Sequence, residues 1–237
     1  FIYKYNLIII CTGGKSELVK NIFSNNSISN SYDESSITTI LSHDALKNNT
    51  ARQIFIDDEI FAMLPISNSK TAIVWSLRNK KKVNYIFKKK IKSYTEKYLS
   101  NIKFISRIQQ RDLNFSIRSK YYKDRILLFG DALHIIHPFA GQGFNMTLRD
   151  LKLLDEVLKK NINLGLDIGG NEILSEFSDK AKPGNFVFSI GTDLLKNSFS
   201  IKNQYFKIAR NEVIKSLNNN SFAKNIFANV ANKGFKF

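Results

Sequence analysis

The chain has 237 residues, of which 43% are hydrophobic and 24% charged, and its formal net charge is +16. That length allows one or two domains with real cores, and that composition excludes a disordered chain. The one cysteine, Cys11, excludes an internal disulfide framework and indicates a reducing compartment, so the expected location is the cytoplasm. No apolar run approaches the roughly 18 residues that cross a bilayer as a helix.

The first segment of the chain predicts a β-strand, a turn and a short helix. Residues 2–12 are mostly apolar and lead into the turn TGGKS, after which SELVKNIF (residues 16–23) has apolar residues at helical spacing. The polar run SNNSISNSYDES (residues 24–35) predicts a loop and a domain boundary. Because Phe1 is not an initiator methionine, we expect the chain to be part of a longer protein.

The next region predicts a β-sheet with one helix. Three strand-like runs, SITTILSHD, RQIFIDDEIFAMLPIS and KTAIVWSLR, follow residue 35, and NSK (residues 68–70) predicts a tight turn between the last two. Residues 83–99 predict a helix, and NIKFISRIQQRDLNFSIRS predicts further strands of the same sheet. The apolar stripe of this helix comprises Val83, Ile86, Phe87, Ile91, Tyr94 and Tyr98.

Lysines are concentrated in residues 79–97, NKKKVNYIFKKKIKSYTEK. A basic helix of this kind can meet nucleic acid, an anionic membrane surface or only solvent. No motif of a nucleic-acid-binding module accompanies the charge, so nucleic acid is not an expected partner. A membrane surface and a solvated face remain equal alternatives.

A short strand and a long helix follow. Residues 126–129, ILLF, predict a strand that is buried on both faces. The strand leads into GDALHIIHPFAGQGFNMTLRDLKLL (residues 130–154), whose helix is predicted to begin near Met146 and to run to about Leu158. Pro183 is expected to break the chain, and the tail after it is predicted to be mostly helical. One face of the first helix is predicted to comprise Leu148, Leu151, Leu154 and Leu158.

The residues between this strand and this helix are suited to a polar ligand. Gly130 lets the chain turn sharply, Asp131 can accept hydrogen bonds from ligand hydroxyls, and Pro138 stiffens the loop. Gly141 and Gly143 would bring backbone N–H groups close to the ligand. The start of a helix also favours negative charge.

A flavin fits this description, since it has a hydroxylated ribityl chain and a ring edge that becomes negative on reduction. The ribityl chain would meet Asp131, and the N1/C2 carbonyl edge would meet the backbone of residues 141–145, where Asn145 can cap the helix. By spacing alone, an ordinary β–loop–helix connection is an equal alternative. A metal site at His134 and His137 is disfavoured by Pro138 and by the missing third ligand, and a hydrogen-bonding role suits His134 better.

The stretch GDALHIIHPFAGQGFNMTLRD closely resembles the second flavin-binding motif of the class A FAD-dependent aromatic monooxygenases. More narrowly, it resembles the ubiquinone-biosynthesis hydroxylases, whose pattern is Gly-Asp-Ala-Ala-His, His-Pro, Gly-Gln-Gly-Leu-Asn and Arg-Asp. FAMLPIS and TAIVWS resemble the substrate-domain strands of this subgroup. GLDIGG, GTDLLKNSFS and IARNEV resemble its C-terminal helical region, so the matches cover nearly the entire chain.

The resemblance implies an α/β (α+β) fold, in which a partial Rossmann-like FAD-binding domain carries an inserted β-sheet substrate domain and a C-terminal helical region. Residues 1–30 would be a remnant of the FAD-binding domain with a degenerate Asp-Gly motif, and residues 31–118 the substrate-binding sheet. Residues 119–182 would return to the FAD-binding domain, and residues 183–237 would form the C-terminal helices.

The resemblance further implies the C-terminal part of a monooxygenase that uses FAD, NAD(P)H and O2 to hydroxylate a polyprenylated phenol in ubiquinone biosynthesis. The basic helix and this lipid-like substrate together predict peripheral contact with the inner face of the membrane, and the ubiquinone-biosynthesis enzyme complex is an expected partner. No acid–base pair is expected, so no catalytic residue is assigned, and Arg149 and Asp150 would anchor the helix. The implied cofactor-binding residues are Gly13, Gly130, Asp131, Pro138, Gly141, Gln142, Gly143 and Asn145.

The sequence departs from the family pattern at four places. It has no Gly-x-Gly-x-x-Gly turn to grip the FAD pyrophosphate. In the Asp-Gly motif region, CTGGKSELVK, Gly13 and Ser16 match. Thr12 replaces the Asp, and Val19 replaces the Arg. Leu133 replaces an Ala, and Thr147 replaces a Gly or Ala of the helix. Two hypotheses therefore stay open: part of a working enzyme, or a non-catalytic remnant or assembly component of the ubiquinone-biosynthesis complex.

Overall fold

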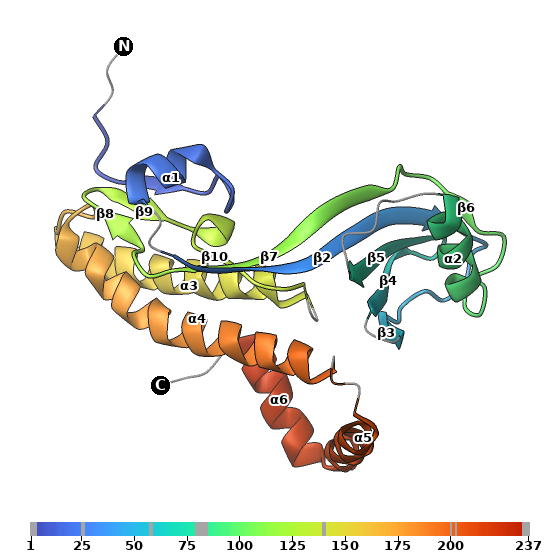
Figure 1. The fold of residues 1–237 in the computed structure, drawn as a ribbon. Coiled ribbons are helices and arrows are strands. Elements are labelled where there is room, and N and C mark those ends of the chain that lie inside the picture. Colours follow the sequence, from blue (N-terminus) through green and yellow to red (C-terminus); the bar gives the residue numbers. More distant parts are fainter. Residues whose placement is uncertain are drawn as a thin grey trace. The chain divides into compact units, whose positions relative to one another are not determined.

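The computed structural model describes residues 4–24, 27–56, 59–78, 85–138, 141–199, 201 and 203–233 (Figure 1). It divides into two compact units, one formed by Phe1–Asn30 with Phe115–Phe237 and the other by Ser31–Asn114. The fold is mixed α/β, with a largely antiparallel sheet and a helical C-terminal region, which confirms the predicted class. None of the helices in the described ranges is long and apolar enough to span a membrane.

The unit of residues 31–114 is an antiparallel sheet with one helix, α2 (Tyr85–Thr95). Its strands lie in the order β7-β2-β5-β4-β3, with β6 paired to β2. The predicted tight turn is confirmed, because Ser67 of β4 pairs with Lys70 of β5. The strands are β2 (Ser27–Ser42), β3 (Arg52–Ile56), β4 (Glu59–Ser67), β5 (Lys70–Arg78), β6 (Lys103–Phe104) and β7 (Gln109–Arg118).

The loop predicted for residues 24–35 was wrong, because β2 begins at Ser27 and continues to Ser42. The polar side chains of this segment are compatible with a strand, since several of them are exposed or hydrogen-bonded. Ser35, for example, is buried, and its Oγ accepts a hydrogen bond from Gln110 Nε2 at 2.9 Å. Residues 25 and 26 lie outside the described ranges.

One face of this sheet packs against α2. The period-2 alternation of β4 and β5 buries Phe61, Met63, Ile73 and Trp75, as expected for a sheet with one covered face. The rings of Phe61, Phe87 and Tyr94 surround Trp75 edge-on, with centroid distances of 5.7, 5.5 and 5.6 Å. These aromatic contacts close the core between sheet and helix.

The basic helix is therefore a core helix with a solvated lysine face. Phe87 and Ile91 of the predicted apolar stripe are buried, whereas Ile86 and Tyr98 are exposed. The helix ends at Thr95, whose hydroxyl donates to the carbonyl of Ile91 at 2.8 Å, so it is shorter than predicted. Residues 79–84, which include Val83, lie outside the described ranges.

The other unit contains a three-stranded sheet of order β1-β9-β8, in which β1 and β9 are parallel. The predicted first strand is confirmed only over residues 8–10 and the predicted first helix over residues 17–23. The strands and turns are β1 (Ile8–Ile10), β8 (Tyr122–Lys123), β9 (Ile126–Leu128), η1 (Gly130–Ala132) and β10 (His134–Ile135), which pairs with β7. The helices are α1 (Glu17–Phe23), α3 (Gln142–Asn163), α4 (Asn171–Phe199), α5 (Gln204–Asn219) and α6 (Ser221–Lys233).

The helix α3 differs from its prediction in both its start and its buried face. It begins at Gln142 instead of near Met146 and ends at Asn163 instead of near Leu158. Leu148 and Leu151 are exposed, whereas Leu154 is buried and Leu158 packs against the apolar cluster, so the predicted leucine face is confirmed only in its second half. The helix turns a mixed face inward, which comprises Met146, Asp150, Leu154, Val157 and Asn161.

The helix α4 runs through Pro183, so the predicted break there was wrong. Proline removes one backbone hydrogen bond, in this helix the one to the carbonyl of Asp179. Asp179 and Pro183 are both exposed, so water can take the place of the lost donor. The helix is held on its other side by Ile173, Leu174 and Phe177, which lie in the same buried cluster as Leu154 of α3.

Candidate functional site

A cleft of about 560 Å³ lies where β1 and β9 end and α3 begins. The register of the parallel pair sets Ile10 opposite Leu128, so the carboxyl ends of both strands meet at one edge of the sheet. Ligands of α/β proteins are commonly held outside such strand ends. The residues that line the cleft are Cys11, Gly13, Phe129, Gly130, Asp131, Gly143, Phe144 and Thr147.

Half of the predicted cofactor-binding residues line this cleft. Gly13 comes from the turn after β1, Gly130 and Asp131 from η1, and Gly143 from the first turn of α3. The other four, Pro138, Gly141, Gln142 and Asn145, belong to the adjoining loop and helix start but do not line it. The structure thus brings together side chains and backbone that are more than a hundred residues apart in sequence.

Two of the cleft glycines have left-handed backbone, with φ of 83° at Gly13 and 62° at Gly130. A Cβ on Gly13 would meet nothing within 4 Å, whereas one on Gly130 would lie 3.6 Å from Cγ2 of Thr147. Thr147 replaces a small residue of the family pattern. Its methyl group lies close to the Gly130 backbone, which has no side chain to obstruct it.

The helix α3 begins without an acidic side chain. Its N-cap, Gly141, has φ 66° and makes no side-chain cap, and no acidic residue occupies the first turn. The N–H of Gly141 donates to the carbonyl of Pro138 at 3.2 Å within its own turn. The capping role predicted for Asn145 was wrong, because this residue lies inside the first turn, where its Nδ2 donates to Oε1 of Gln142 at 3.3 Å. The helix start remains open to an electron-rich group.

Asp131 is exposed at the wall of the cleft, on a turn that Arg118 holds in place. The buried guanidinium of Arg118 donates from Nε to the carbonyl of Ala132 at 3.0 Å, and its backbone N–H donates to the carbonyl of Leu133 at 3.1 Å. Burial lowers the pKa of Arg118. No local pattern marks this arginine, because its partners lie in a turn that begins more than ten residues further along the chain.

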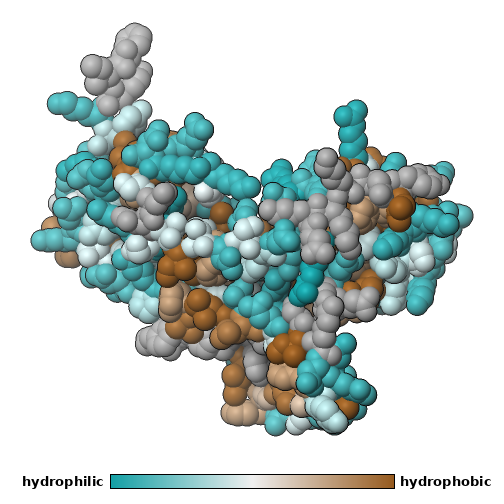
Figure 2. All heavy atoms as spheres, in the orientation of Figure 1, coloured by the Kyte–Doolittle hydropathy of each residue, from teal (hydrophilic) through white to brown (hydrophobic). Residues whose placement is uncertain are grey.

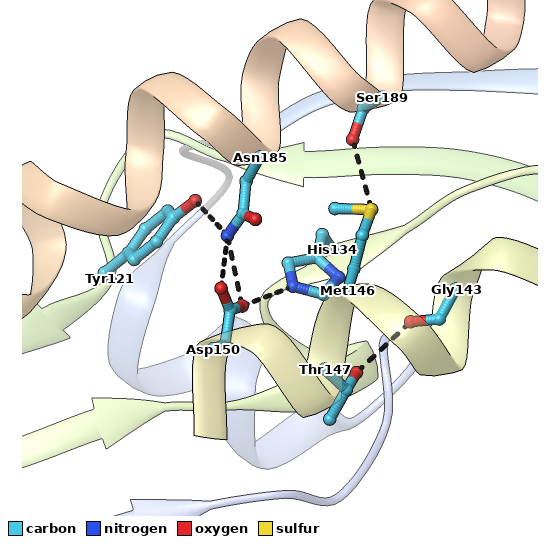
Figure 3. A network of polar contacts seen from close by, with 8 residues as sticks. All are labelled: Tyr121, His134, Gly143, Met146, Thr147, Asp150, Asn185 and Ser189. Atoms are coloured by element: carbon cyan, nitrogen blue, oxygen red, sulfur yellow. Dashed lines mark hydrogen bonds and ion pairs between the residues drawn. The ribbon is translucent and has the colours of Figure 1, made fainter. Parts of the chain in front are cut away.

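Behind the cleft, a buried polar network joins β10, α3 and α4 (Figure 3). His134 Nε2 lies 2.7 Å from Oδ2 of Asp150, which confirms the hydrogen-bonding role expected for His134. Asn185 Nδ2 donates to both carboxylate oxygens of Asp150, at 3.0 and 3.1 Å. These bonds connect β10, which begins three residues after Asp131, to α3, which begins at the cleft.

Tyr121, which is fully buried, is the fourth member of the network. Its hydroxyl accepts a hydrogen bond from Asn185 Nδ2 at 3.4 Å. Burial raises the pKa of Tyr121 to about 12, which the hydrogen bond from Asn185 opposes and the charge of Asp150 supports. Arg149, the neighbour of Asp150, places its guanidinium 4.2 Å from the ring centroid of Phe188 on α4. Both residues of the Arg-Asp pair thus anchor α3 to α4, as the resemblance implies.

Two departures from the family pattern lie in the core instead of the cleft. Leu133 and Val19 are both buried in the apolar cluster of this unit, and neither lines the cleft. Within the described ranges, no group of three His, Cys, Asp or Glu side chains could hold a metal ion. The candidate site therefore consists of three glycines, one free carboxylate, a helix start and an apolar rim.

The chain is similar to known proteins over most of its length. A family model described as "FAD binding domain" matches residues 5–183. The ubiquinone hydroxylase UbiL of Rhodospirillum rubrum is 28% identical over 175 residues, which cover 71% of this chain and 41% of that protein. The mitochondrial ubiquinone biosynthesis monooxygenase COQ6 of Dictyostelium discoideum is 34% identical over 111 residues, which cover 47% of this chain and 22% of that protein. The chain thus spans less than half of the length of these two relatives.

The fold is also that of solved structures. The p-nitrophenol 4-monooxygenase PnpA of Pseudomonas putida superposes with a TM-score of 0.77 at 13% sequence identity. This superposition covers 98% of the chain and 60% of PnpA. At that identity the likeness shows the fold alone.

Proposed function

The chain belongs to the FAD-binding domain family, and from this premise we propose that the cleft at the start of α3 holds the flavin half of FAD. One observation carries the proposal: Asp131 and the open first turn of α3 line the same cleft. The Asp131 carboxylate would accept hydrogen bonds from the ribityl hydroxyls, and the backbone near Gly143 would face the electron-rich edge of the ring. Phe129 and Phe144 would keep water from the ring.

The residues that surround the cleft fit such a ligand. Gly13, Gly130 and Gly143 have no Cβ, so backbone can approach a flat ring closely. Bound FAD would supply the redox chemistry, and the protein would bind and orient it and exclude water. The side chain of Asp131 forms no hydrogen bond with any residue in the described ranges, so its carboxylate is available to a ligand.

We further propose that the whole protein hydroxylates a polyprenylated phenol of ubiquinone biosynthesis with NAD(P)H and O2, at the periphery of a membrane. The names of the relatives support this reaction. In this proposal residues 31–118 form the substrate-binding sheet and residues 183–237 the C-terminal helices. A non-catalytic component of the ubiquinone-biosynthesis complex is the second candidate, which Thr12 and Val19 favour because they replace the Asp and Arg of the family pattern.

Flavin titrations of the 237-residue chain test the proposal. We expect FAD to bind weakly, without surviving gel filtration, because the sequence has no turn for the pyrophosphate. Riboflavin should compete with FAD, as measured by flavin fluorescence, and ADP should not. Stoichiometric flavin after gel filtration would refute the expected weakness, and competition by ADP but not by riboflavin would refute the assignment of the flavin half.

Asp131→Ala is the matching variant. We expect it to weaken flavin binding by about 10- to 100-fold, the range for losing a hydrogen bond to a charged group. Asp155→Ala, an exposed carboxylate on α3 that pairs with Lys159, is the control and should bind flavin like the unmodified chain. Equal flavin affinity of Asp131→Ala and the unmodified chain would remove Asp131 from the site.

A further inference from the structure

The helices α5 and α6 stand apart from the apolar cores of the protein. None of their described side chains is buried, whereas α3 and α4 each bury a continuous face. Tyr205 at the start of α5 is 85% exposed and Phe222 at the start of α6 is 74% exposed. Large apolar side chains that are exposed on these two helices comprise Tyr205, Phe206, Ile208, Val213, Ile214, Phe222 and Ile226.

Four of these apolar residues form pairs at helical spacing. On α5, Phe206 and Val213 are seven residues apart, and on α6, Phe222 and Ile226 are four apart, so each pair lies on one face of its helix. Lys215 lies on the opposite side of α5 from this pair, and Lys207 lies on its flank. Figure 2 shows apolar side chains beside hydrophilic ones over α5 and α6. A helix of this kind needs a covering layer for its apolar face.

The charge of α5 and α6 indicates what covers their apolar faces. From residue 201 onward the sequence contains a single acidic residue, Glu212, which pairs with Lys215 at 2.7 Å. Other basic residues of the two helices, Lys207, Arg210 and Lys224, outnumber it. A cationic helix with an exposed apolar face matches an anionic lipid surface, which attracts the lysines and accepts the apolar side chains.

The lysine-rich helix α2 does not have this combination. Its residues Phe87 and Ile91 are buried against the sheet, so it offers charge to a membrane but little apolar surface to insert. Charge alone gives a weak attraction that salt screens, whereas inserted apolar side chains add a contribution that salt does not remove.

We propose that α5 and α6 form the membrane-contact surface of this protein and bind anionic lipid. Phe206, Val213, Phe222 and Ile226 enter the boundary between headgroups and acyl chains. The lysines of the polar faces pair with the lipid phosphates. The inference rests on the membrane contact of the proposed function and is independent of its flavin chemistry.

Vesicle co-sedimentation of the full chain tests this surface. The vesicles contain phosphatidylglycerol and phosphatidylcholine in equal amounts, or phosphatidylcholine alone. We expect binding to the anionic vesicles only, and a loss of about tenfold or more in partitioning for Phe222→Ser/Ile226→Ser. The matched control is Ile66→Ser/Ile86→Ser, which alters two exposed isoleucines of the sheet unit and should bind like the unmodified chain. Far-UV circular dichroism checks that both variants are folded.

Each other outcome of these experiments overturns a defined part of the proposal. If the unmodified chain binds no vesicle, the membrane contact and this surface both fail, while the flavin titrations stand. If Phe222→Ser/Ile226→Ser binds anionic vesicles as well as the control does, the surface fails and the membrane contact stands. If gel filtration shows a dimer that this variant dissociates, the apolar faces join two copies of the chain and the lipid assignment is wrong.

Discussion

The two units of the chain bury their central side chains in different ways. In the unit of residues 31–114, Trp75 is fully buried among aromatic rings that meet it edge-on. In the other unit, the buried Asp150 lies among His134 and Asn185, in hydrogen-bond contact with both. Aromatic packing is insensitive to protonation, whereas the network depends on it. The second kind of core also reaches the cleft, because β10 and α3 both continue from residues that line it.

The largest expected effect is in the aromatic core. Trp75→Ala should lower the free energy of unfolding by about 3–5 kcal/mol, because it leaves a large cavity between β5 and α2. Trp75→Phe should cost much less, since it keeps most of the contacts and removes an indole N–H that has no hydrogen-bond partner in the described ranges. Urea unfolding followed by circular dichroism measures both. Ile66→Ala, on an exposed position of β4, is the control. A loss below about 1 kcal/mol for Trp75→Ala would show that this core is not well packed.

The next effect is in the polar network. Asp150→Ala should lower the free energy of unfolding by about 3 kcal/mol, because His134 and Asn185 lose a buried partner. It should also weaken flavin binding, whereas Trp75→Phe should not, and this difference sharpens the contrast between the two units. Asp150→Asn keeps an acceptor oxygen, so its free energy of unfolding should lie between those of the unmodified chain and Asp150→Ala. Unchanged flavin affinity in Asp150→Ala would separate the network from the cleft.

The smallest effect is a pH dependence of stability that arises from Tyr121 in the network. Unfolded tyrosine ionises near pH 10, whereas Tyr121 keeps its proton until about pH 12 because burial raises its pKa. The stability that this group contributes is therefore complete below pH 10 and is lost as the pH rises from 10 to 12, by about 2–3 kcal/mol. Urea unfolding of Tyr121→Phe at pH 8 to 11 should fall less steeply with pH than that of the unmodified chain. Identical slopes would contradict the assignment.

The sequence predicted those parts of the fold that depend on neighbouring residues. The turn at residues 68–70 and the strand of β9 follow from short local patterns. The gathering of Gly130, Asp131 and Gly143 at one cleft follows from their positions between a strand and a helix. Such features can be predicted without knowing which distant residues pack against them.

Other parts depended on distant residues and could not be predicted in the same way. The leucines of α3 define a face that overlaps the buried face only in part, and the packing against α4 turns Asp150 and Leu154 inward. Asn185 reaches Asp150 from 35 residues away, and no local pattern marks it as a partner. The polar composition of residues 24–35 concealed a strand, because sheet partners such as Gln110 satisfy its side chains.

The proline in α4 gives that helix one preferred place to flex. A helix bends most easily where a backbone hydrogen bond is missing, and in α4 that place is the turn before Pro183. Asn185 follows two residues later, so a change in the angle between the halves of α4 would alter its distances to Asp150 first. Bending of α4 at Pro183 would therefore act directly on the contact between Asn185 and the histidine–carboxylate pair, and through Asp150 on α3.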